Sequence, residues 1–323
     1  MASLAIQPTT APAVVKDASA HASPSPAQKA DVAEMADIAL LDSDIKAPFD
    51  SIRQLFDHLR ANQEAADALN ATYPSRGVFK TAALKNSASD QKLTIDISPN
   101  RLSRVPAELK SSLAPYGFSE VINFFEELTA KHFDNMLSVL SKAAGVDLFP
   151  VHRSRNINFR LCDYPPVTAD PESENGCGAH RDYGTFSIIF QDGNEGLEIE
   201  RPSQPGVWVP VPADKLVMLC GWCAFIVTGG ELRAVRHRVR RQPGVRRLSA
   251  VLFVAPDLDV ALKPIPQGEH AVQFSSDILE AKYNVGWFKE FMGKRWRWRE
   301  GNAQLEDGEK ITQDEDIERL ILG

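Results

Sequence analysis

The sequence predicts a mostly β core with flanking α-helices, arranged as a sandwich or jelly roll. Two observations predict this class. Short runs rich in branched and aromatic residues follow one another between residues 156 and 254, with turn residues between them. Helical apolar patterns stand before and after that region, whereas a parallel α/β fold would alternate them with the strands.

The N-terminal part reads as two regions. Residues 1–33 are rich in Ala, Ser, Pro and Thr without apolar periodicity, so we expect a disordered arm. Residues 34–150 are expected to form a helical and mixed support region, with Ile38–Asp42 as the nearest candidate for an opening strand. A first helix begins near Pro48. Its apolar stripe follows the i, i+3, i+4, i+7 spacing of one helical face and consists of Ile52, Leu55, Phe56 and Leu59.

A second helix is predicted from Phe118 to about Ala144, with Gly145 as its terminator. Such helices can support one side of a sheet. Its stripe is made of apolar side chains at helical spacing: Val121, Phe125, Leu128, Phe133, Leu137, Leu140 and Ala144.

Residues 151–260 are predicted to form the β core. Turn pairs such as Pro205-Gly206, Gly229-Gly230 and Pro243-Gly244 separate its strands. The predicted strands are 158–162, 185–190, 197–200, 216–220, 225–228 and 248–254.

Residues 261–323 are predicted to form a C-terminal helical cap. Its apolar residues are expected to fold back on the core: Ile278, Leu279, Phe288 and Phe291. The basic and aromatic run Lys294–Arg299 is soon followed by acidic residues. We interpret it as the solvated face of a terminal helix.

Composition narrows the function classes. The 323 residues are 43% hydrophobic and 24% charged, which fits one large catalytic unit with flanking elements. The formal net charge of −7 argues against a general nucleic-acid binder. No apolar run is long enough for a membrane span and no secretory signal is evident, so a cytoplasmic location is expected. Four cysteines do not indicate a disulfide framework in a chain of this length.

Two short motifs are typical of a metal centre. On an extended strand, residues i and i+2 share a face, so His180 and Asp182 can offer an imidazole and a carboxylate to one metal. A returning strand can bring His237 as the third ligand. Two histidines and one carboxylate with open positions opposite form the facial triad of non-haem Fe(II) oxygenases. The intervening Arg181 and the residues beside His237 are expected to face solvent or a lid.

A third motif adds an anion-binding pair. Arg247 and Ser249 also alternate, so a guanidinium and a hydroxyl can hold one carboxylate further inside the fold. Each motif alone has an ordinary interpretation, such as a loop pair or a strand-edge decoration. Their occurrence in order, each at a strand edge, favours the functional interpretation.

Two other function classes use the same residues. A mononuclear zinc hydrolase could employ the same three ligands and a metal-bound water. The Arg247/Ser249 pair and the lack of an obvious general base argue against it. A non-catalytic scaffold that keeps only the fold is disfavoured, because the triad and the anion-binding pair are both intact.

The stretch from Asn156 to Pro256 resembles the core of the Fe(II)- and 2-oxoglutarate-dependent dioxygenases, in the isopenicillin N synthase-like branch. The matching segments are 163–166, 178–184, 227–230, 235–239 and 247–249. Asp90–Ser98 is similar to fungal natural-product members, including the ring-expanding oxygenase of tropolone biosynthesis. This resemblance implies a distorted double-stranded β-helix, which is a cupin-like jelly roll.

The resemblance also implies roles for individual residues. Iron would be bound by His180, Asp182 and His237, and the distal carboxylate of 2-oxoglutarate by Arg247 and Ser249. Tyr164 lies where the family often supplies a hydroxyl to that carboxylate. Two positions earlier the family frequently has Asn, but this chain has Cys162.

The implied reaction uses Fe(II), 2-oxoglutarate and O2 to oxidise a small natural product, such as an aromatic or polyketide-derived compound. Hydroxylation, desaturation and ring expansion all remain open. By strand alternation Arg160 can meet an anionic or phenolic substrate, or form a structural salt bridge. Phe186, Phe225 and Trp222 are expected to line the pocket, or else to belong to the core. No nucleic acid, membrane or obligate protein partner is expected.

Overall fold

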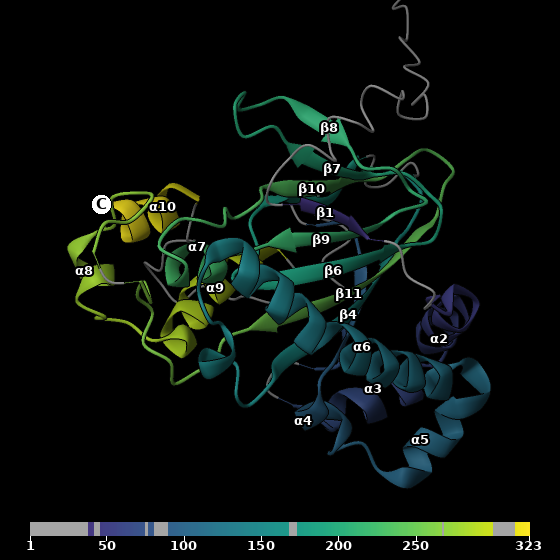
Figure 1. The fold of residues 1–323 in the computed structure, drawn as a ribbon. Coiled ribbons are helices and arrows are strands. Elements are labelled where there is room, and N and C mark those ends of the chain that lie inside the picture. Colours follow the sequence, from purple (N-terminus) through teal and green to yellow (C-terminus); the bar gives the residue numbers. More distant parts are fainter. Residues whose placement is uncertain are drawn as a thin grey trace, which may run out of the picture.

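Two antiparallel β-sheets form the centre of the computed structural model, and helices cover the outer face of the larger sheet (Figure 1). The structure describes residues 38–41, 46–74, 77–80, 90–167, 173–266, 268–299 and 314–323. The strand bounds are Ile38–Leu41 (β1), Phe79–Lys80 (β2), Leu93–Ile97 (β3), Asn156–Tyr164 (β4), Asn175–His180 (β5), Phe186–Gln191 (β6), Leu197–Glu200 (β7), Trp208–Pro210 (β8), Leu216–Cys220 (β9), His237–Arg240 (β10) and Arg247–Ala255 (β11).

The larger sheet has seven strands in the order β1-β9-β6-β11-β4-β3-β2, and the smaller sheet has four in the order β5-β10-β7-β8. Side chains from both sheets share one apolar cluster, so the sheets pack face to face. The jelly-roll class predicted from the strand pattern is therefore confirmed. Five of the six predicted strands lie within two residues of an observed strand at each end.

Strand β11 shows how alternation separates the two faces of the larger sheet. Leu248, Ala250, Leu252 and Val254 belong to the cluster beneath the helices. The intervening residues line a cavity between the sheets, namely Arg247, Ser249, Val251 and Phe253. Because successive strand residues point to opposite faces, this one strand supplies both the core and the cavity wall.

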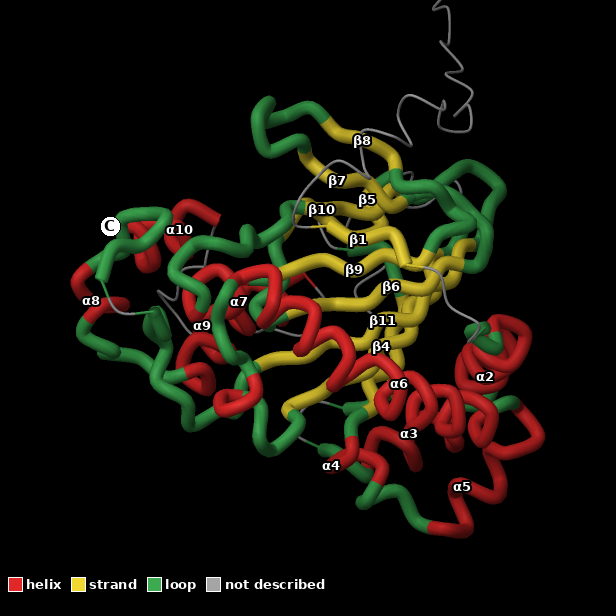
Figure 2. Tube along the Cα trace, in the orientation of Figure 1, coloured by secondary structure: helices red, strands yellow, loops and turns green. Residues whose placement is uncertain are grey.

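Both helices predicted from apolar stripes before the β core are present, and Figure 2 shows the helices in red. Their bounds are Phe49–Ala61 (α2), Gln63–Ala71 (α3), Pro99–Leu102 (α4), Ala107–Leu113 (α5), Phe118–Ala144 (α6), Trp222–Val227 (α7), Ser276–Leu279 (α8), Val285–Arg299 (α9) and Asp314–Leu322 (α10), with 3-10 turns at Ala114–Tyr116 and Phe149–Val151. Helix α6 has its predicted bounds, and Gly145 ends it in the left-handed conformation. Its Phe125 stacks on Phe159 of β4 at 5.4 Å between ring centroids. Burying one such ring contributes roughly 1.5–3 kcal/mol.

The prediction of a strand at 225–228 is wrong, because these residues belong to helix α7 and the turn after it. A short, fully buried apolar run has no polar face, so its periodicity cannot distinguish strand from helix. Hydrogen bonds from the first peptide groups of α7 favour the helix over a strand. The N–H groups of Trp222 and Cys223 donate to the carbonyls of Asp182 and Tyr183, both at 2.9 Å.

The C-terminal helices α8, α9 and α10 pack with α7 in a separate apolar cluster. Ile278 and Phe288 are buried there and Phe291 packs at its edge, as predicted for a cap. Leu279 is the exception, since it is 49% exposed. The side chains of the basic run after Lys294 lie outside the described residues.

The domain boundaries 34–150, 151–260 and 261–323 stay predictions, and the N-terminal arm at residues 1–33 lies outside the described residues. All four cysteines are buried free thiols, which agrees with the absence of a disulfide framework. None of the helices in the described ranges is both long and apolar enough to cross a membrane.

Candidate metal centre

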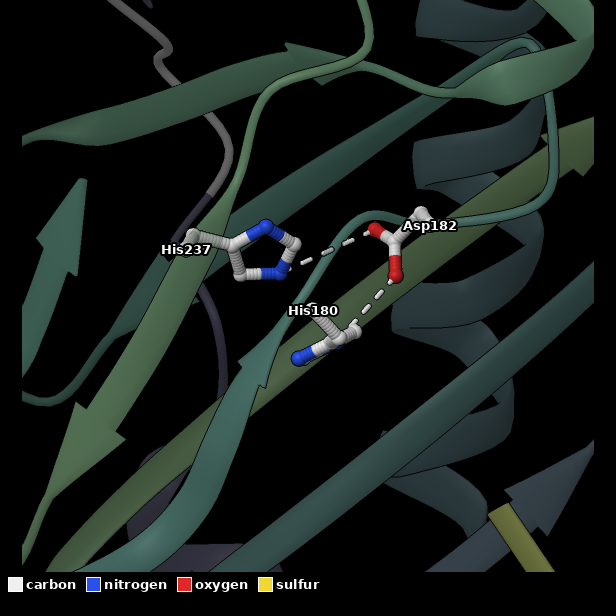
Figure 3. Close-up of side chains that lie close together, drawn as sticks. All are labelled: His180, Asp182 and His237. Atoms are coloured by element: carbon white, nitrogen blue, oxygen red, sulfur yellow. Dashed lines mark ion pairs between the residues drawn. The ribbon is translucent and has the colours of Figure 1, made fainter. Parts of the chain in front are cut away.

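The three predicted ligands converge at one end of the smaller sheet (Figure 3). His180 is the last residue of β5 and His237 is the first residue of β10, and the two are paired in the antiparallel register. Asp182 follows in the loop after β5. One ligand atom from each residue lies within 4.8 Å of the other two.

The way in which Asp182 reaches the site differs from the prediction. Strand β5 ends at His180, so strand alternation does not place the carboxylate. The N-terminus of α7 holds the Asp182 carbonyl instead, and the Ser187 hydroxyl donates to Asp182 Oδ2 at 2.5 Å. Gly221 permits this approach, because a Cβ there would lie 2.8 Å from the Asp182 carbonyl oxygen.

Backbone carbonyls orient both imidazoles. His180 Nδ1 lies 2.8 Å from the Gly178 oxygen, and His237 Nδ1 lies 3.1 Å from the Val235 oxygen. A carbonyl only accepts, so each Nδ1 carries the proton and donates it. Each Nε2 therefore faces the carboxylate, at 3.4 Å from Asp182 Oδ1 for His180 and 3.9 Å from Oδ2 for His237. Fixing the tautomer through the second ring nitrogen is typical of metal-binding histidines.

The two histidines of the triad have pKa values shifted in opposite directions. Burial disfavours a charged His180, but attraction by Cys177 and Asp182 outweighs burial and raises the pKa of His180 to about 10. Burial and the nearby His180 lower the pKa of His237 to about 4. Both imidazoles together hold the pKa of Asp182 below its ordinary value despite burial. A divalent cation between the three groups would replace the proton on His180, as metal ligation requires.

The triad lines a cavity of about 480 Å³ between the two sheets. The same cavity is lined by the other predicted site residues on β4 and β11: Arg160, Tyr164, Arg247 and Ser249. Strand register explains this convergence. Arg247 is opposite Tyr164 and Ser249 is opposite Cys162, so their side chains share the inner face of the larger sheet.

Arg247 is buried and only partly satisfied. Its Nε donates to the Asn194 carbonyl at 3.2 Å and its Nη2 donates to Gln191 Oε1 at 3.0 Å. Its buried Nη1 has no hydrogen-bond partner among the described residues. The guanidinium carbon lies 5.2 Å from the Tyr164 ring centroid. Two neutral acceptors thus hold the Arg247 guanidinium in place and leave its Nη1 for a further acceptor.

Arg160 lies in the cavity wall but already has a carboxylate partner. Its Nε and Nη2 donate to the two oxygens of Asp96 at 2.7 and 3.0 Å. Lys80 Nζ lies 2.7 Å from the same carboxylate. Of the two roles considered for Arg160, the structure thus contains the structural salt bridge. Its partner Asp96 was not found from the sequence. The sequence pattern of β3 did not indicate that Asp96 faces the cavity, because the strand is buried on both faces and its polar and apolar residues are equally covered.

Phe186 and Phe225 do not line this cavity, contrary to expectation. Phe186 is 1% exposed and points to the helix side of β6. Phe225 belongs to α7 and packs 5.6 Å from Phe274 in the C-terminal cluster, together with Trp222. Phe225 was expected in the cavity because residues 225–228 were predicted to be a strand. In helix α7 its ring lies in the C-terminal apolar cluster instead.

The arginines beside the ligands form ion pairs instead of facing solvent. Arg181 Nη1 lies 2.8 Å from Glu318 of α10, and Arg236 contacts Glu200 at 2.8 Å. Arg236 also reaches Asp314 of α10 at 3.3 Å. Arg238 pairs with Glu198 at 2.5 Å. The C-terminal helix thus contacts the outer side of both ligand-bearing segments.

A buried polar cluster next to His180 was also missed. Asp90 Oδ1 accepts from the Gly178 N–H at 2.9 Å, and its Oδ2 lies 3.2 Å from Lys92 Nζ. Lys92 Nζ also donates to Cys177 Sγ at 3.0 Å. The resemblance noted at Asp90–Ser98 was the available signal. The cluster fixes the segment that carries His180.

Comparison with known proteins agrees with this geometry. Residues 155–256 match the family model described as the 2OG-Fe(II) oxygenase superfamily. The 2-oxoglutarate-dependent dioxygenase frbA of Dothideomycetidae sp. (strain 11243) is 34% identical over 122 residues, which cover 33% of this chain and 36% of that protein. The 2-oxoglutarate-dependent dioxygenase tropC of Talaromyces stipitatus is 36% identical over 113 residues, 34% of each protein. The match thus spans about a third of these relatives' length.

The fold is similar to the crystal structure of the dioxygenase for auxin oxidation in rice. The TM-score is 0.55 at 17% sequence identity, over 79% of this chain and 84% of that chain. At that identity the similarity concerns the fold alone. Fold, triad and family match nevertheless agree, and it is residues 155–256 of this chain that match the 2OG-Fe(II) oxygenase superfamily.

Proposed function

We propose that the chain is a non-haem iron oxygenase that couples oxidative decarboxylation of 2-oxoglutarate to oxidation of a small organic molecule. One observation carries the proposal. The His180, Asp182 and His237 triad opens into the same cavity as a buried guanidinium, Arg247, whose Nη1 has no partner among the described residues. A metal site and a carboxylate site in one cavity are what a chelating 2-oxo acid requires.

The donor set fits Fe(II). Two imidazole nitrogens and one carboxylate would hold the ion, and the cavity that they line would leave room for its other ligands. Iron, when bound, supplies the activation of dioxygen, and the protein supplies orientation. Ser187 and the carbonyls of Gly178 and Val235 keep the three ligands in place through hydrogen bonds.

The cosubstrate is proposed to lie between the triad and Arg247. Arg247 Nη1 would donate to the distal carboxylate of 2-oxoglutarate, with the Ser249 hydroxyl as a second donor. Tyr164 lies opposite Arg247 in the register and lines the same end of the cavity. Burial of Arg247 at 3% exposure makes this contact stronger than it would be in water.

A small-molecule substrate fits an enzyme of this superfamily, and we propose that it occupies the rest of the cavity. Arg160 lies in that wall, but its pairing with Asp96 gives it first the role of a structural support. The chemical outcome, whether hydroxylation, desaturation or ring expansion, stays a prediction. So do the natural-product class of the substrate, a cytoplasmic location, and the absence of nucleic-acid, membrane and obligate protein partners.

The zinc hydrolase alternative gains no support from the comparisons, which name 2-oxoglutarate-dependent dioxygenases. The Arg247 site would also have no evident task in metal-assisted hydrolysis.

Anaerobic titration tests the proposed function. Fe(II) followed by 2-oxoglutarate should produce a charge-transfer absorption band in the visible region, and admission of O2 should yield succinate. His180→Ala should abolish both signals, whereas His58→Ala, on the remote helix α2, should retain them. Folded, iron-loaded protein that gives no band and binds no 2-oxoglutarate would contradict the proposal.

A further inference from the structure

The cavity has a second end, away from the proposed cosubstrate site. On β4 the side chains of Asn158, Arg160, Cys162 and Tyr164 all line the cavity. Tyr164 is opposite Arg247, whereas Asn158 is opposite Phe253. Tyr164 is six positions after Asn158 on the strand, which corresponds to roughly 20 Å. Bound 2-oxoglutarate at Arg247 would therefore leave the Asn158 end open to another molecule.

Arg101 of helix α4 forms part of this second end. Its Nη1 donates to Asn158 Oδ1 at 2.7 Å, and its guanidinium carbon lies 4.7 Å from the Tyr73 ring centroid. Its Nε is buried and has no hydrogen-bond partner in the part of the chain that the structure describes. The guanidinium is thus held in position by a neutral amide and a ring.

The nearby carboxylate of Asp96 attracts Arg101 electrostatically but accepts no hydrogen bond from it, because other donors already occupy its oxygens. Oδ1 accepts from Arg160 Nε at 2.7 Å and from Asn158 Nδ2 at 3.1 Å. Oδ2 accepts from Lys80 Nζ at 2.7 Å and from Arg160 Nη2 at 3.0 Å. The hydrogen bonds of Asp96 thus go to Arg160, Asn158 and Lys80, and the Nε of Arg101 stays without an acceptor among the described residues.

The four arginines that line the cavity fall into two pairs. Arg155 and Arg160 each have a carboxylate partner, Asp134 and Asp96 respectively. Arg247 and Arg101 have none among the described residues, and each has a buried nitrogen without a partner. A buried guanidinium donor without an acceptor destabilises the protein, so a site that keeps one is suited to an acceptor brought by a ligand.

We propose that Arg101, with Asn158, is a second anion-binding subsite and that the substrate is a small organic acid whose carboxylate binds there. This inference rests on the proposed function, because the bound acid is a substrate only if the chain is an oxygenase. The carboxylate would accept from Arg101 Nε and replace the missing partner. The cavity would then hold two acids, 2-oxoglutarate at Arg247 and the substrate at Arg101, with the metal ligands lining the same space.

Binding of a simple acid tests the subsite without turnover. Protein loaded with Mn(II) and saturated with 2-oxoglutarate, so that Arg247 is occupied, is titrated with benzoate and with benzamide, its neutral counterpart. We expect benzoate to bind about tenfold more tightly than benzamide, because one contact distinguishes them and it is charge-assisted. Arg101→Gln should remove this preference, and Arg101→Lys should restore part of it.

Arg104→Gln is the matched control. Arg104 lies 5.2 Å from the same Tyr73 ring, but it is exposed and does not line the cavity. Its removal takes away an equal charge and should leave the benzoate preference unchanged. Equal benzoate affinity in wild type and Arg101→Gln, or no benzoate binding at millimolar concentration, would overturn the inference. Since 2-oxoglutarate binding is measured in the same samples, its loss would instead count against the proposed function.

Discussion

Arg246 and Arg247 are neighbours in the chain and yet have opposite surroundings. Arg246 donates to both oxygens of the buried Asp163, at 2.9 and 2.7 Å. Arg247 points into the cavity, has only neutral acceptors, and keeps one nitrogen without a partner among the described residues. The Arg246 guanidinium is used by the fold through its carboxylate partner, whereas that of Arg247 is the one proposed to bind a ligand.

The same contrast holds around the metal centre. On its outer side, Arg181 and Arg236 are paired with acidic side chains of α10. On the cavity side, Arg101 and Arg247 are held by neutral groups. Arg160 is the exception, because it lines the cavity and is paired with Asp96. Among the arginines that line the cavity, the partner therefore separates Arg155 and Arg160, which are paired with carboxylates, from Arg101 and Arg247, which are proposed to bind ligands.

The largest effect is expected on stability, when the Asp96 partner of Arg160 is changed in Asp96→Asn. Asp96 is 1% exposed and accepts from two cations, so its neutralisation should lower the free energy of unfolding by roughly 3–5 kcal/mol. Burial opposes the charge, but Arg160 and Lys80 outweigh it and hold the pKa of Asp96 well below 3.8. The stabilisation should therefore be complete above pH 3.8 and decline as pH falls through the folded-state pKa.

Urea unfolding at several pH values measures this loss. Asp134→Asn is the control, since its pair with Arg155 is exposed on both sides and should change stability by less than about 1 kcal/mol. Equal losses in the two variants would mean that Asp96 has no special structural role.

Arg247→Gln should come next, with an effect on binding and little on folding. Loss of a charged donor predicts about 1.5–3 kcal/mol, or roughly 10- to 150-fold weaker 2-oxoglutarate binding, with iron still bound. Calorimetry on Mn(II)-loaded protein measures it. Arg246→Gln should show the reverse, with lower stability and unchanged affinity. A comparable affinity loss in both variants would break the distinction between the two arginines.

Ser187→Ala asks whether the inner hydrogen bond or the outer ion pairs hold Asp182. The Ser187 hydroxyl is 1% exposed and donates to Asp182 Oδ2. Outer-shell partners of this kind typically influence metal affinity about 10- to 100-fold, so we expect a loss in that range. Competition with a chelator measures it, and unchanged iron affinity would remove Ser187 from this role.

Glu318→Gln should have the smallest effect. The Arg181–Glu318 pair is partly exposed, at 22% and 43% of the two side chains, so its loss should reduce stability by less than about 1 kcal/mol. Iron affinity should remain within about twofold of wild type. A tenfold loss in the chelator assay would instead show that α10 positions the ligands.

Much of the fold followed from local pattern. Helix α6 has apolar residues at helical spacing along its whole length and a glycine at its end, so both bounds were readable. Strand β11 was readable because an uninterrupted apolar run near turn residues is typical of a buried strand. The run at 225–228 has the same composition and forms a helix, because hydrogen bonds to residues 182–184 decide its geometry.

The site was predictable to a similar degree. His180 and Asp182 could be found because a metal centre needs particular atoms and these two residues lie two positions apart, and His237 because it belongs to a recognisable short motif on a predicted returning strand. Asp96 and Arg101 could not, because their importance depends on which side chains 57 to 64 residues away share the cavity. Phe186 shows the reverse failure, since its residue type fits a pocket but its position in the strand turns it to the helices.

By itself the sequence determined the chemistry available to this protein, namely three candidate metal ligands, an arginine–serine pair and the apolar periods that make strands and helices. These depend on residue type and short spacing, which the chain carries locally. Only the tertiary structure decided which arginines have carboxylate partners, how Asp182 is held by α7, and which aromatic rings leave the cavity. Those outcomes depend on contacts between segments that strand register brings together across long stretches of chain.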